Sequence, residues 1–330
     1  MKVSRVWGTT VATISKTCKN TIKRAMEESS ESLEGLEFKL HDFGARSVSS
    51  YESSGIGGAA HLVNFMGTDT MAALQTVMRY YNMKGVPGFS IPAAEHSTMS
   101  PWGRGQGEVE AYRNMIQQYG GKYPLMAVVS DTWDVFNAAE NIWGDELRQE
   151  VMDSGTMLVV RPDSGDPATV VLKLLEILGR KFGYEINTKG YKVLNNVRVI
   201  QGDGINVDSI PQIIETFMSE AWSMDNVTFG MGGGLLQMNN RDTLKFAYKC
   251  SAICIDGEWK DVYKDPVTDA GKRSKRGRLE LFKFDGQYVT VAEKDYDAKT
   301  PGDRLLETVF LDGEVVKELT FEEVRENASV

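Results

Sequence analysis

The chain has 330 residues, of which 42% are hydrophobic and 25% charged, and its formal net charge at pH 7 is −9. This is the composition of a globular protein with a buried core, and the acidic balance argues against a general nucleic-acid binder, which would usually be basic. The sequence has no signal peptide or membrane-length apolar run, and its three cysteines form no Cys-x-x-Cys pair, so we expect free thiols and a cytoplasmic protein.

An amphipathic helix is predicted over residues 15–28, because Cys18, Ile22, Ala25 and Met26 fall on one helical face. Between residues 86 and 234, short apolar runs that end in polar or glycine-rich clusters alternate with amphipathic helices. The predicted strands cover residues 86–91, 124–129, 157–160, 197–200 and 227–229. Buried strands separated by helices indicate a parallel α/β sheet or barrel. In such folds the ligand binds at the carboxyl ends of the strands.

The pattern changes after about residue 240. Strands are predicted over residues 279–284, 288–292 and 307–310, with turns at Asp285-Gly286 and Asp312-Gly313 and a closing helix over residues 320–327. We expect a smaller β-rich region there that includes the N-terminal segment or packs against it.

The motif Arg161-Pro162-Asp163-Ser164-Gly165 stands between a predicted buried strand and a helix start. A helix N-terminus offers free N–H groups to phosphate. Arg161 could grip a phosphate through two hydrogen bonds, and Asp163 could hold ribose hydroxyls or a magnesium-bound water. The alternative is structural: Asp163 or Ser164 caps the helix, and Arg161 forms a surface ion pair.

Two glycine-rich motifs, Gln201-Gly202-Asp203-Gly204 and Gly232-Gly233-Gly234, would let a ligand approach the backbone, although such glycines are also common in plain turns. Neither fits the dinucleotide fingerprint or the P-loop, which argues against a dinucleotide dehydrogenase and a P-loop kinase. His96 follows Glu95 at a predicted strand end. No Gly-x-Ser-x-Gly elbow accompanies it, so a serine-hydrolase triad is discounted.

A basic run over residues 272–278 places five cations in seven residues. A solvated loop is the usual interpretation of such a run. A lid over a polyphosphate, together with Lys264, fits equally well, and a nucleic-acid patch agrees poorly with the acidic chain.

Seven motifs in order resemble those of the nicotinamide phosphoribosyltransferases, a family of type II phosphoribosyltransferases. They are His41-Asp42-Phe43-Gly44-Ala45-Arg46, Gly67-Thr68-Asp69-Thr70, Pro92-Ala93-Ala94-Glu95-His96-Ser97, Arg161-Pro162-Asp163-Ser164-Gly165, Gln201-Gly202-Asp203-Gly204, Gly232-Gly233-Gly234-Leu235-Leu236-Gln237 and Lys272-Arg273-Ser274-Lys275. The resemblance extends from about residue 10 to residue 327. It implies transfer of the phosphoribosyl group of phosphoribosyl pyrophosphate to nicotinamide, giving nicotinamide mononucleotide and pyrophosphate in NAD salvage.

The resemblance also implies roles for single residues. Phe43 would stack on the nicotinamide ring, and Asp69 would accept the carboxamide N–H. Arg46 and Arg161 would grip phosphate and ribose phosphate, with Asp163 beside the ring and ribose. The remaining implied binding residues, at the ribose, the 5′-phosphate and the polyphosphate, are Gly202, Asp203, Gly233, Arg241, Lys264 and Lys272.

The implied catalytic residues are His96, Asp131 and Asp163. His96 would be phosphorylated by ATP, as an optional coupling step, and Asp131 would lie near the magnesium-pyrophosphate end. Mg²⁺ would be held through pyrophosphate, so no residue is assigned as its direct ligand. Two positions depart from the family, because Ala45 replaces a tyrosine and Ala247 replaces a serine.

The implied fold is an irregular parallel α/β barrel-like catalytic domain over residues 41–238. Segments 1–40 and 239–330 would form part of a smaller α+β sandwich domain, which an N-terminal portion found in the family would complete. In the family, that portion contributes to the dimer and supplies, from the partner subunit, an aromatic ring for the second face of nicotinamide. We therefore expect a homodimer or a complex with a separate N-terminal polypeptide.

Three alternatives remain open from the sequence. A nicotinate-using relative is disfavoured because Asp69 would repel the substrate carboxylate. A partner-dependent or inactive subunit could retain the same pocket. An RNA-binding protein using residues 272–278 would reveal itself by salt-sensitive RNA binding.

Overall fold

The structure is a computed structural model that describes residues 6–240, 242–246, 248–295 and 302–329, and only the backbone of Val6 and Ser47. Contacts divide the chain into two compact units, one comprising residues 1–244 with 320–330 and the other residues 245–319. Each unit is described by itself. Among the described residues, no helix has the length and apolar character needed to cross a membrane.

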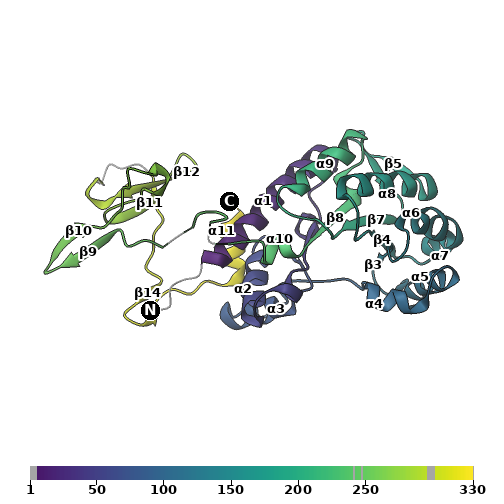
Figure 1. Ribbon diagram of the computed structural model, residues 1–330, viewed down its shortest axis with the longest axis horizontal. Coiled ribbons are helices and arrows are strands. Elements are labelled where there is room, and N and C mark those ends of the chain that lie inside the picture. The colour runs from purple at the N-terminus through teal and green to yellow at the C-terminus, as the bar shows by residue number, and fades with distance from the viewer. Residues whose placement is uncertain (1–5, 241, 247, 296–301, 330) are drawn as a thin grey trace. The chain divides into compact units, whose positions relative to one another are not determined.

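Six parallel strands form the centre of the first unit, in the order β2-β1-β8-β7-β4-β3 (Figure 1). Their bounds are β1 Leu40–Asp42, β2 Gly67–Thr68, β3 Leu125–Val129, β4 Met157–Arg161, β7 Val197–Gln201 and β8 Val227–Met231. The last four confirm the strands predicted from their apolar runs, most of whose side chains are buried. The expected class, an α/β fold with a parallel sheet, is confirmed.

The sheet is closed by a segment that is not a regular strand. Phe89 bridges to Gly67 next to one edge, and Ala93 bridges to Ala127 at the other. The Phe89 N–H donates to Met66 O (2.7 Å), and the Ala94 N–H donates to Ala127 O (2.9 Å). The strand predicted over residues 86–91 is therefore wrong as a regular strand, because prolines at both ends of this segment cannot donate to a ladder. The result is an irregular barrel.

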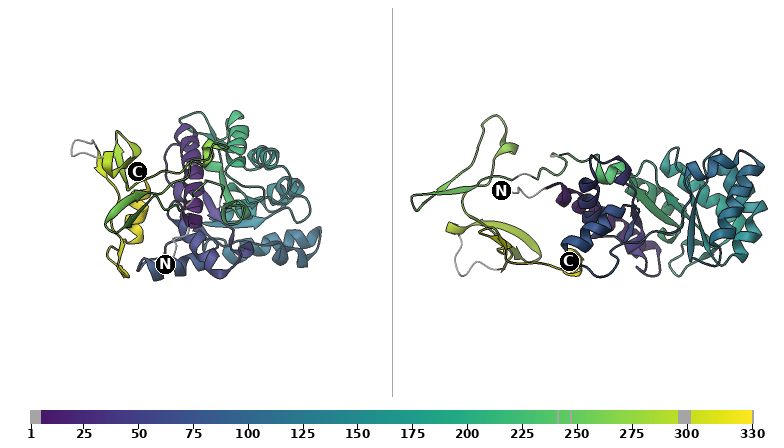
Figure 2. Two further views of the ribbon diagram at one scale, coloured as in Figure 1. Left: turned by 60° about the vertical axis from the view of Figure 1, so that its left-hand side comes forward. Right: turned by 90° about the horizontal axis from the view of Figure 1, so that it is seen from below.

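Helices cover the outside of the barrel, as the views in Figures 1 and 2 show together. The longer ones are α1 Val6–Ser29, α2 Tyr51–Leu62, α3 Met71–Tyr80, α5 Gln106–Tyr119, α7 Arg148–Asp153, α8 Pro167–Phe182, α9 Ser209–Ser219 and α11 Phe321–Ser329. Shorter elements are α4 His96–Met99, α6 Val135–Asn137, η4 Ala138–Glu146, α10 Gly233–Leu236 and the hairpin of β5 Tyr184–Ile186 with β6 Lys192–Leu194. The predicted helix over residues 15–28 is confirmed as part of α1, which begins earlier than the sequence suggested.

Helix α8 shows how the sequence determines these elements. Asp166 accepts the Thr169 N–H (2.9 Å) as N-cap, and Pro167 occupies the first turn, where its missing N–H costs no hydrogen bond. One stripe of the helix is fully buried against the sheet, as predicted. Gly183 ends the helix with φ 79°, a conformation that favours glycine.

His61 on α2 links two helices to two strands. The ring is fully buried; Nε2 lies 3.2 Å from both Leu40 O and Gly67 O, and Nδ1 lies 3.0 Å from Ser15 Oγ. Because carbonyl oxygens only accept, Nε2 carries the proton and Nδ1 accepts from the Ser15 hydroxyl. Burial lowers the pKa of His61 to about 3, so the ring is neutral in the folded protein.

The second unit consists of short antiparallel strands: β9 Ala252–Ile255, β10 Glu258–Asp261, β11 Leu279–Phe284, β12 Gln287–Ala292, β13 Asp303–Arg304, β14 Phe310–Leu311 and β15 Glu314–Val315. Two tight turns are confirmed at Asp285-Gly286 and Asp312-Gly313, where all four residues have positive φ. The predicted strand over residues 307–310 is regular only from Phe310 onward.

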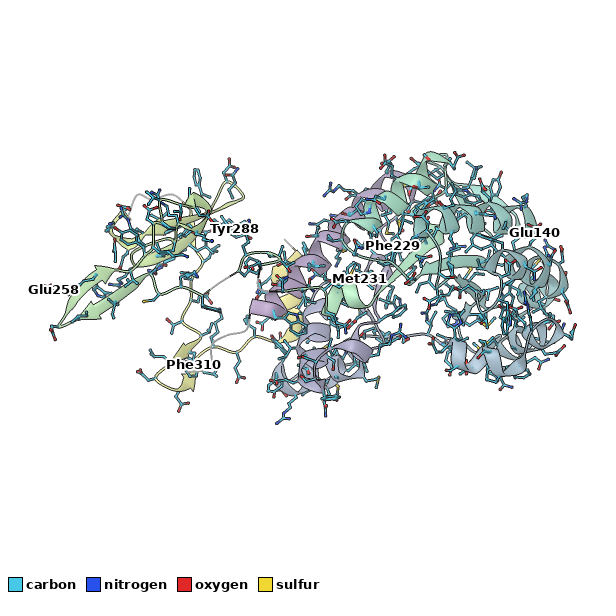
Figure 3. All side chains as sticks on the ribbon, viewed as in Figure 1. Glu140, Phe229, Met231, Glu258, Tyr288 and Phe310 are labelled. Carbon is cyan, nitrogen blue, oxygen red and sulfur yellow. The ribbon has the colours of Figure 1, made fainter. Side chains whose placement is uncertain are left out.

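Several large apolar side chains of the second unit are exposed. Figure 3 labels Glu140 on the helical surface of the first unit and Tyr288 and Phe310 in the second. Tyr288 is 63% exposed and Phe310 61% exposed, so large apolar side chains of the second unit face solvent. Division by contacts also places α1 and α11 with the barrel. The division predicted from the sequence, residues 41–238 against 1–40 with 239–330, stays a prediction about the family's domains.

Candidate active site

A cavity of about 570 Å³ lies at the carboxyl ends of the barrel strands. The first unit supplies eight predicted binding residues to its lining: Phe43, Arg46, Asp69, Arg161, Asp163, Gly202, Asp203 and Gly233. They follow β1, β2, β4, β7 and β8, so side chains far apart in the sequence meet at one edge of the sheet.

Phe43 is held by the strand end that precedes it. Its N–H donates to Met231 O (3.0 Å), which extends the pairing of β1 with β8 by one residue. The ring lies against two glycines: a β-carbon added at Gly230 would lie 1.9 Å from a ring carbon, and one added at Gly202 would lie 3.5 Å away. The guanidinium of Arg161 lies 5.2 Å from the ring centroid. The Phe43 ring therefore forms an aromatic surface of the cavity, the aromatic floor, with the Arg161 cation beside it.

The guanidinium of Arg161 lies near two carboxylates, and one of its N–H groups has no hydrogen-bond acceptor among the described residues. Its Nη2 donates to Asp163 Oδ1 (2.9 Å), and Nη1 lies 3.9 Å from Glu95 Oε2. The buried Nε has no hydrogen-bond partner among the described residues. An unpaired buried donor costs free energy, and a guanidinium is a common ligand for oxyanions.

Asp69 lies in the same cavity, next to β2. The Asp69 N–H donates to Asp42 O (3.0 Å), and the Ser90 hydroxyl donates to Asp69 Oδ1 (2.6 Å). Ser90 was not identified from the sequence; the only signal was its position just before the Pro92-Ala93-Ala94-Glu95-His96 motif. Together they present a hydrogen-bonded carboxylate to the cavity.

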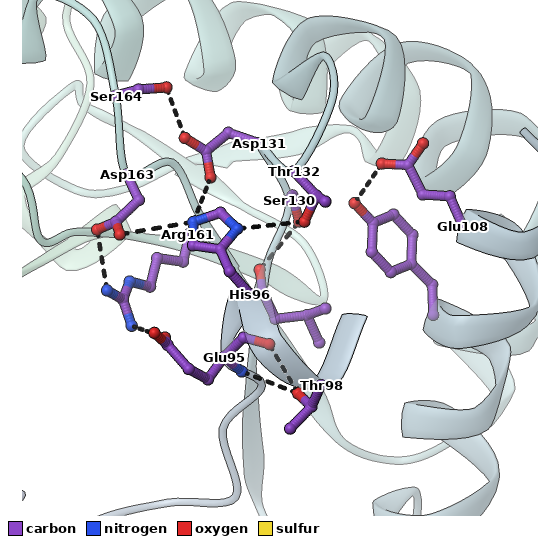
Figure 4. Close-up of polar contacts among 12 residues, drawn as sticks. Glu95, His96, Thr98, Glu108, Ser130, Asp131, Thr132, Arg161, Asp163 and Ser164 are labelled. Atoms are coloured by element: carbon purple, nitrogen blue, oxygen red, sulfur yellow. Dashed lines mark hydrogen bonds and ion pairs between the residues drawn. The ribbon is translucent and has the colours of Figure 1, made fainter. Parts of the chain in front are cut away.

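Carboxylates flank His96, the first residue of α4 (Figure 4). Its Nε2 lies 3.3 Å from Asp131 Oδ1 and 3.6 Å from Asp163 Oδ2, and its Nδ1 lies 3.3 Å from Thr132 Oγ1. The ring is therefore oriented by groups that follow β3 and β4. Of the three residues predicted as catalytic, His96 thus lies beside both Asp131 and Asp163, and their chemical roles stay predictions.

The loop carrying Asp131 is supported from behind. Trp143 Nε1 donates to Ser130 Oγ (3.1 Å), and the Ser164 hydroxyl donates to Asp131 Oδ2 (2.5 Å). The Trp143 ring stacks on Tyr112, whose hydroxyl donates to Glu108 (2.9 Å; Figure 4). These supporting contacts were not predicted, because the sequence does not show which residues lie behind a strand end.

The residue that caps the helix after Arg161 is not one of the two that the sequence suggested. Asp166, rather than Asp163 or Ser164, caps α8, so the capping alternative for Asp163 and Ser164 is wrong. The same cap occupies the Thr169 N–H, so this donor is not free for phosphate.

Other predicted residues cannot be placed against the cavity. Arg241 and Ala247 lie outside the described residues. Lys264 and Lys272 belong to the second unit, where Lys272 Nζ lies 3.4 Å from Asp269 Oδ2. Their relation to phosphate stays a prediction.

No compact group of three or more His, Cys, Asp or Glu side chains that could hold a metal ion occurs in the part of the chain that the structure describes. Asp131 and Asp163 nevertheless offer carboxylate oxygens beside the cavity, and the buried Asp131 Oδ1 accepts no hydrogen bond. Mg²⁺ typically binds one or two carboxylates together with substrate phosphates. The residues present therefore fit a magnesium ion brought in by pyrophosphate.

The chain is similar in sequence to known proteins. The sequence pattern of the Nicotinate phosphoribosyltransferase (NAPRTase) family matches residues 38–314. The chain is 52% identical to a nicotinamide phosphoribosyltransferase of Xanthomonas campestris pv. campestris, over 98% of this chain and 70% of the relative. It is 29% identical to one of Acinetobacter baylyi, over 98% of this chain and 67% of that relative. A solved nicotinate phosphoribosyltransferase of Porphyromonas gingivalis matches with a TM-score of 0.47 and 14% identity, over 81% of this chain and 61% of that one.

Proposed function

Since the chain belongs to the nicotinate phosphoribosyltransferase family, we propose that it transfers the phosphoribosyl group of phosphoribosyl pyrophosphate to nicotinamide. The products would be nicotinamide mononucleotide and pyrophosphate, in salvage of NAD. The observation that carries this proposal is a single cavity lined by the Phe43 ring, the Asp69 carboxylate and the Arg161 guanidinium. These are an aromatic face, an acceptor for an amide N–H and a grip for phosphate.

The base would be recognised by Phe43 and Asp69. The ring of Phe43 offers a stacking surface, and an aromatic stack contributes ~0.5–1.5 kcal/mol beyond area burial. The Asp69 carboxylate accepts N–H donors and repels anions, which favours the carboxamide of nicotinamide over the carboxylate of nicotinate. The relatives named above as nicotinamide phosphoribosyltransferases support the same choice.

The transfer forms a bond between the pyridine nitrogen and the ribose C1 carbon, while the bond from C1 to the pyrophosphate oxygen breaks. Positive charge develops on the sugar, and Asp163 would stabilise it. Arg161 and Arg46 would hold phosphate groups in line with the base. Mg²⁺, when bound through pyrophosphate, would neutralise the departing charge. No side-chain nucleophile is required.

We also propose that ATP can phosphorylate His96. A ring nitrogen of His96 would bond to the γ phosphorus as the bond to the β–γ bridging oxygen breaks, releasing ADP. Asp131 and Asp163 lie 3.3 Å and 3.6 Å from Nε2, and they would orient the ring and stabilise its positive charge. Hydrolysis of the phosphohistidine would then couple ATP to synthesis.

The proposal extends to the partner. The Phe43 ring covers one face of the bound base, and we expect an aromatic ring from a second subunit, or from a separate polypeptide, to cover the other. In the second unit, Ile253 and Ile255 lie on the same face of β9 and are 45% and 46% exposed, so a partner could bury both of them. The free thiols of Cys18, Cys250 and Cys254 fit a cytoplasmic enzyme.

The proposed reaction is tested by incubating the purified chain with nicotinamide, phosphoribosyl pyrophosphate and Mg²⁺ and measuring the mononucleotide by mass spectrometry. Parallel reactions use nicotinate. Formation of nicotinate mononucleotide alone would favour the nicotinate-using alternative.

In a second experiment, the chain is co-expressed with a segment of the Xanthomonas relative. The segment is taken from the part of that relative that this chain does not match. We expect higher activity and a larger, defined complex by light scattering. Absence of product both alone and with that segment would favour an inactive subunit that retains the pocket.

A further inference from the structure

A fully buried carboxylate lies behind the cavity without lining it. Asp42 is the last residue of β1, and its exposed fraction is 0%. It pairs with Thr68 of β2 on one side and with Met231 of β8 on the other. The residue therefore stands at the junction of three strands whose ends carry the base-recognition side chains.

The contacts of Asp42 reach both sides of the proposed base site. Its Oδ1 accepts the Gly44 N–H (2.8 Å), which fixes the turn directly after Phe43. Its main-chain oxygen accepts the Asp69 N–H (3.0 Å), which fixes the residue proposed to bind the carboxamide. One residue thus connects the aromatic floor to the carboxylate acceptor.

The second carboxylate oxygen faces the outer helices. A β-carbon added at Gly58 of α2 would lie 3.1 Å from Asp42 Oδ2 and 2.9 Å from Thr70 Cγ2. Burial raises the pKa of Asp42 to about 6, while the Gly44 N–H and the neighbouring Thr70 hydroxyl lower it. Oδ2 accepts no well-formed hydrogen bond among the described residues, so its burial costs free energy.

We propose that Asp42 is a positioning residue for nicotinamide recognition: it sets the distance between Phe43 and Asp69 without contacting the substrate. This inference rests on the proposed function and concerns only its base-binding step. Phosphoribosyl pyrophosphate would be held mainly by Arg161 at the end of β4, which Asp42 does not contact. A substitution of Asp42 should therefore raise the KM for nicotinamide and leave the KM for phosphoribosyl pyrophosphate nearly unchanged.

The test measures steady-state kinetics for both substrates on the active enzyme. Asp42→Ala leaves the Gly44 N–H buried without an acceptor, and we expect the nicotinamide KM to rise about tenfold or more. The KM for phosphoribosyl pyrophosphate should stay within about twofold, because Arg161 and its contacts are unchanged. Asp42→Asn keeps the acceptor and gains a donor toward Thr70, so it should restore the nicotinamide KM to within about threefold of the wild type.

The matched control is Asn226→Ala. Asn226 is also fully buried, and its Oδ1 accepts the Leu194 N–H (2.7 Å), but it precedes β8 at the amino end of the barrel. Its loss should lower stability without changing the ratio of the two KM values. Should Asp42→Ala not fold, Asp42→Leu decides, because it keeps a branched side chain in the same space, removes the acceptor for the Gly44 N–H and should also raise the nicotinamide KM selectively.

The outcomes separate the two claims. A wild-type enzyme without nicotinamide turnover would overturn the proposed function and this inference with it. An active wild type whose nicotinamide KM is unchanged in Asp42→Ala, or whose two KM values rise equally, would overturn the inference alone.

Discussion

The ring of Phe43 occupies the space that a β-carbon of Gly230 would need, 1.9 Å from the nearest ring carbon. We predict that Gly230→Ala displaces the ring and raises the nicotinamide KM by about tenfold or more, because a displaced ring loses its stacking geometry. Steady-state kinetics with varied nicotinamide provides the measurement. Gly8→Ala in α1 is the control: its nearest neighbour would lie 3.4 Å away, and alanine suits a helix, so kinetics should not change. Unaltered kinetics in Gly230→Ala would mean that Phe43 does not contact the base.

Asp69 should determine the choice of base. We predict that Asp69→Ser weakens nicotinamide use by about 1–3 kcal/mol, the range for a buried hydrogen bond to a charged group, and narrows the preference over nicotinate. The values of kcat/KM for both bases decide this. Asp208→Ser, at an exposed position before α9, serves as a control of equal chemistry. Unchanged discrimination in Asp69→Ser would remove this carboxylate from the base site.

His96 should be needed for ATP coupling and not for basal synthesis. We predict that His96→Ala retains measurable mononucleotide synthesis and loses the gain from ATP. Incubation with γ-labelled ATP should label the wild type and leave His96→Ala unlabelled. Asp131→Asn should reduce labelling, because it removes the charge 3.3 Å from Nε2. Equal labelling of wild type and His96→Ala would disprove the assignment.

His61 should make the fold sensitive to acid. Its pKa is lowered from 6.5 to about 3, so below pH 6.5 the unfolded chain binds a proton that the folded chain does not. Its contribution to stability is therefore complete above pH 6.5 and is lost as the pH falls toward 3. The free energy of unfolding should fall by ~1.4 kcal/mol per pH unit from this group between about pH 6 and 4. Urea unfolding of the wild type and His61→Gln across this range gives the difference, and identical slopes would contradict the prediction.

The strands β3, β4, β7 and β8 could be predicted because each is a largely apolar run with mostly buried side chains, followed by a polar or glycine-rich cluster. β1 and β2 could not, because they contain only three and two residues and include the polar His41, Asp42 and Thr68. The segment from Val86 to Ile91 resembles a strand in composition, but prolines prevent it from forming a ladder.

The sequence indicated which residues belong to the candidate site better than it indicated how they are arranged in space. The family resemblance implied Phe43, Asp69 and Arg161 individually, and the structure places all three in the lining of one cavity. The placement of Asp131 and Asp163 on one nitrogen of His96 depends on which strands are neighbours, and a single sequence does not encode that order in any local pattern. The same limit applies to Ser90 and Gly230, whose roles come from contacts across the barrel.

Successive side chains of β1 and of Phe43 after it point to opposite faces of the sheet. This segment should therefore tolerate an insertion or a deletion less well than a substitution. His41 lines a cavity of about 640 Å³ and Phe43 lines the candidate site, whereas Leu40 joins the main core and Asp42 lies toward Gly58. Inserting or deleting a single residue between Lys39 and Phe43 would exchange the two sets, because the side-chain period of a strand is two. A phenylalanine would then point at the helices and a carboxylate into the barrel. Such an indel should be far more damaging here than any conservative substitution in the same four positions.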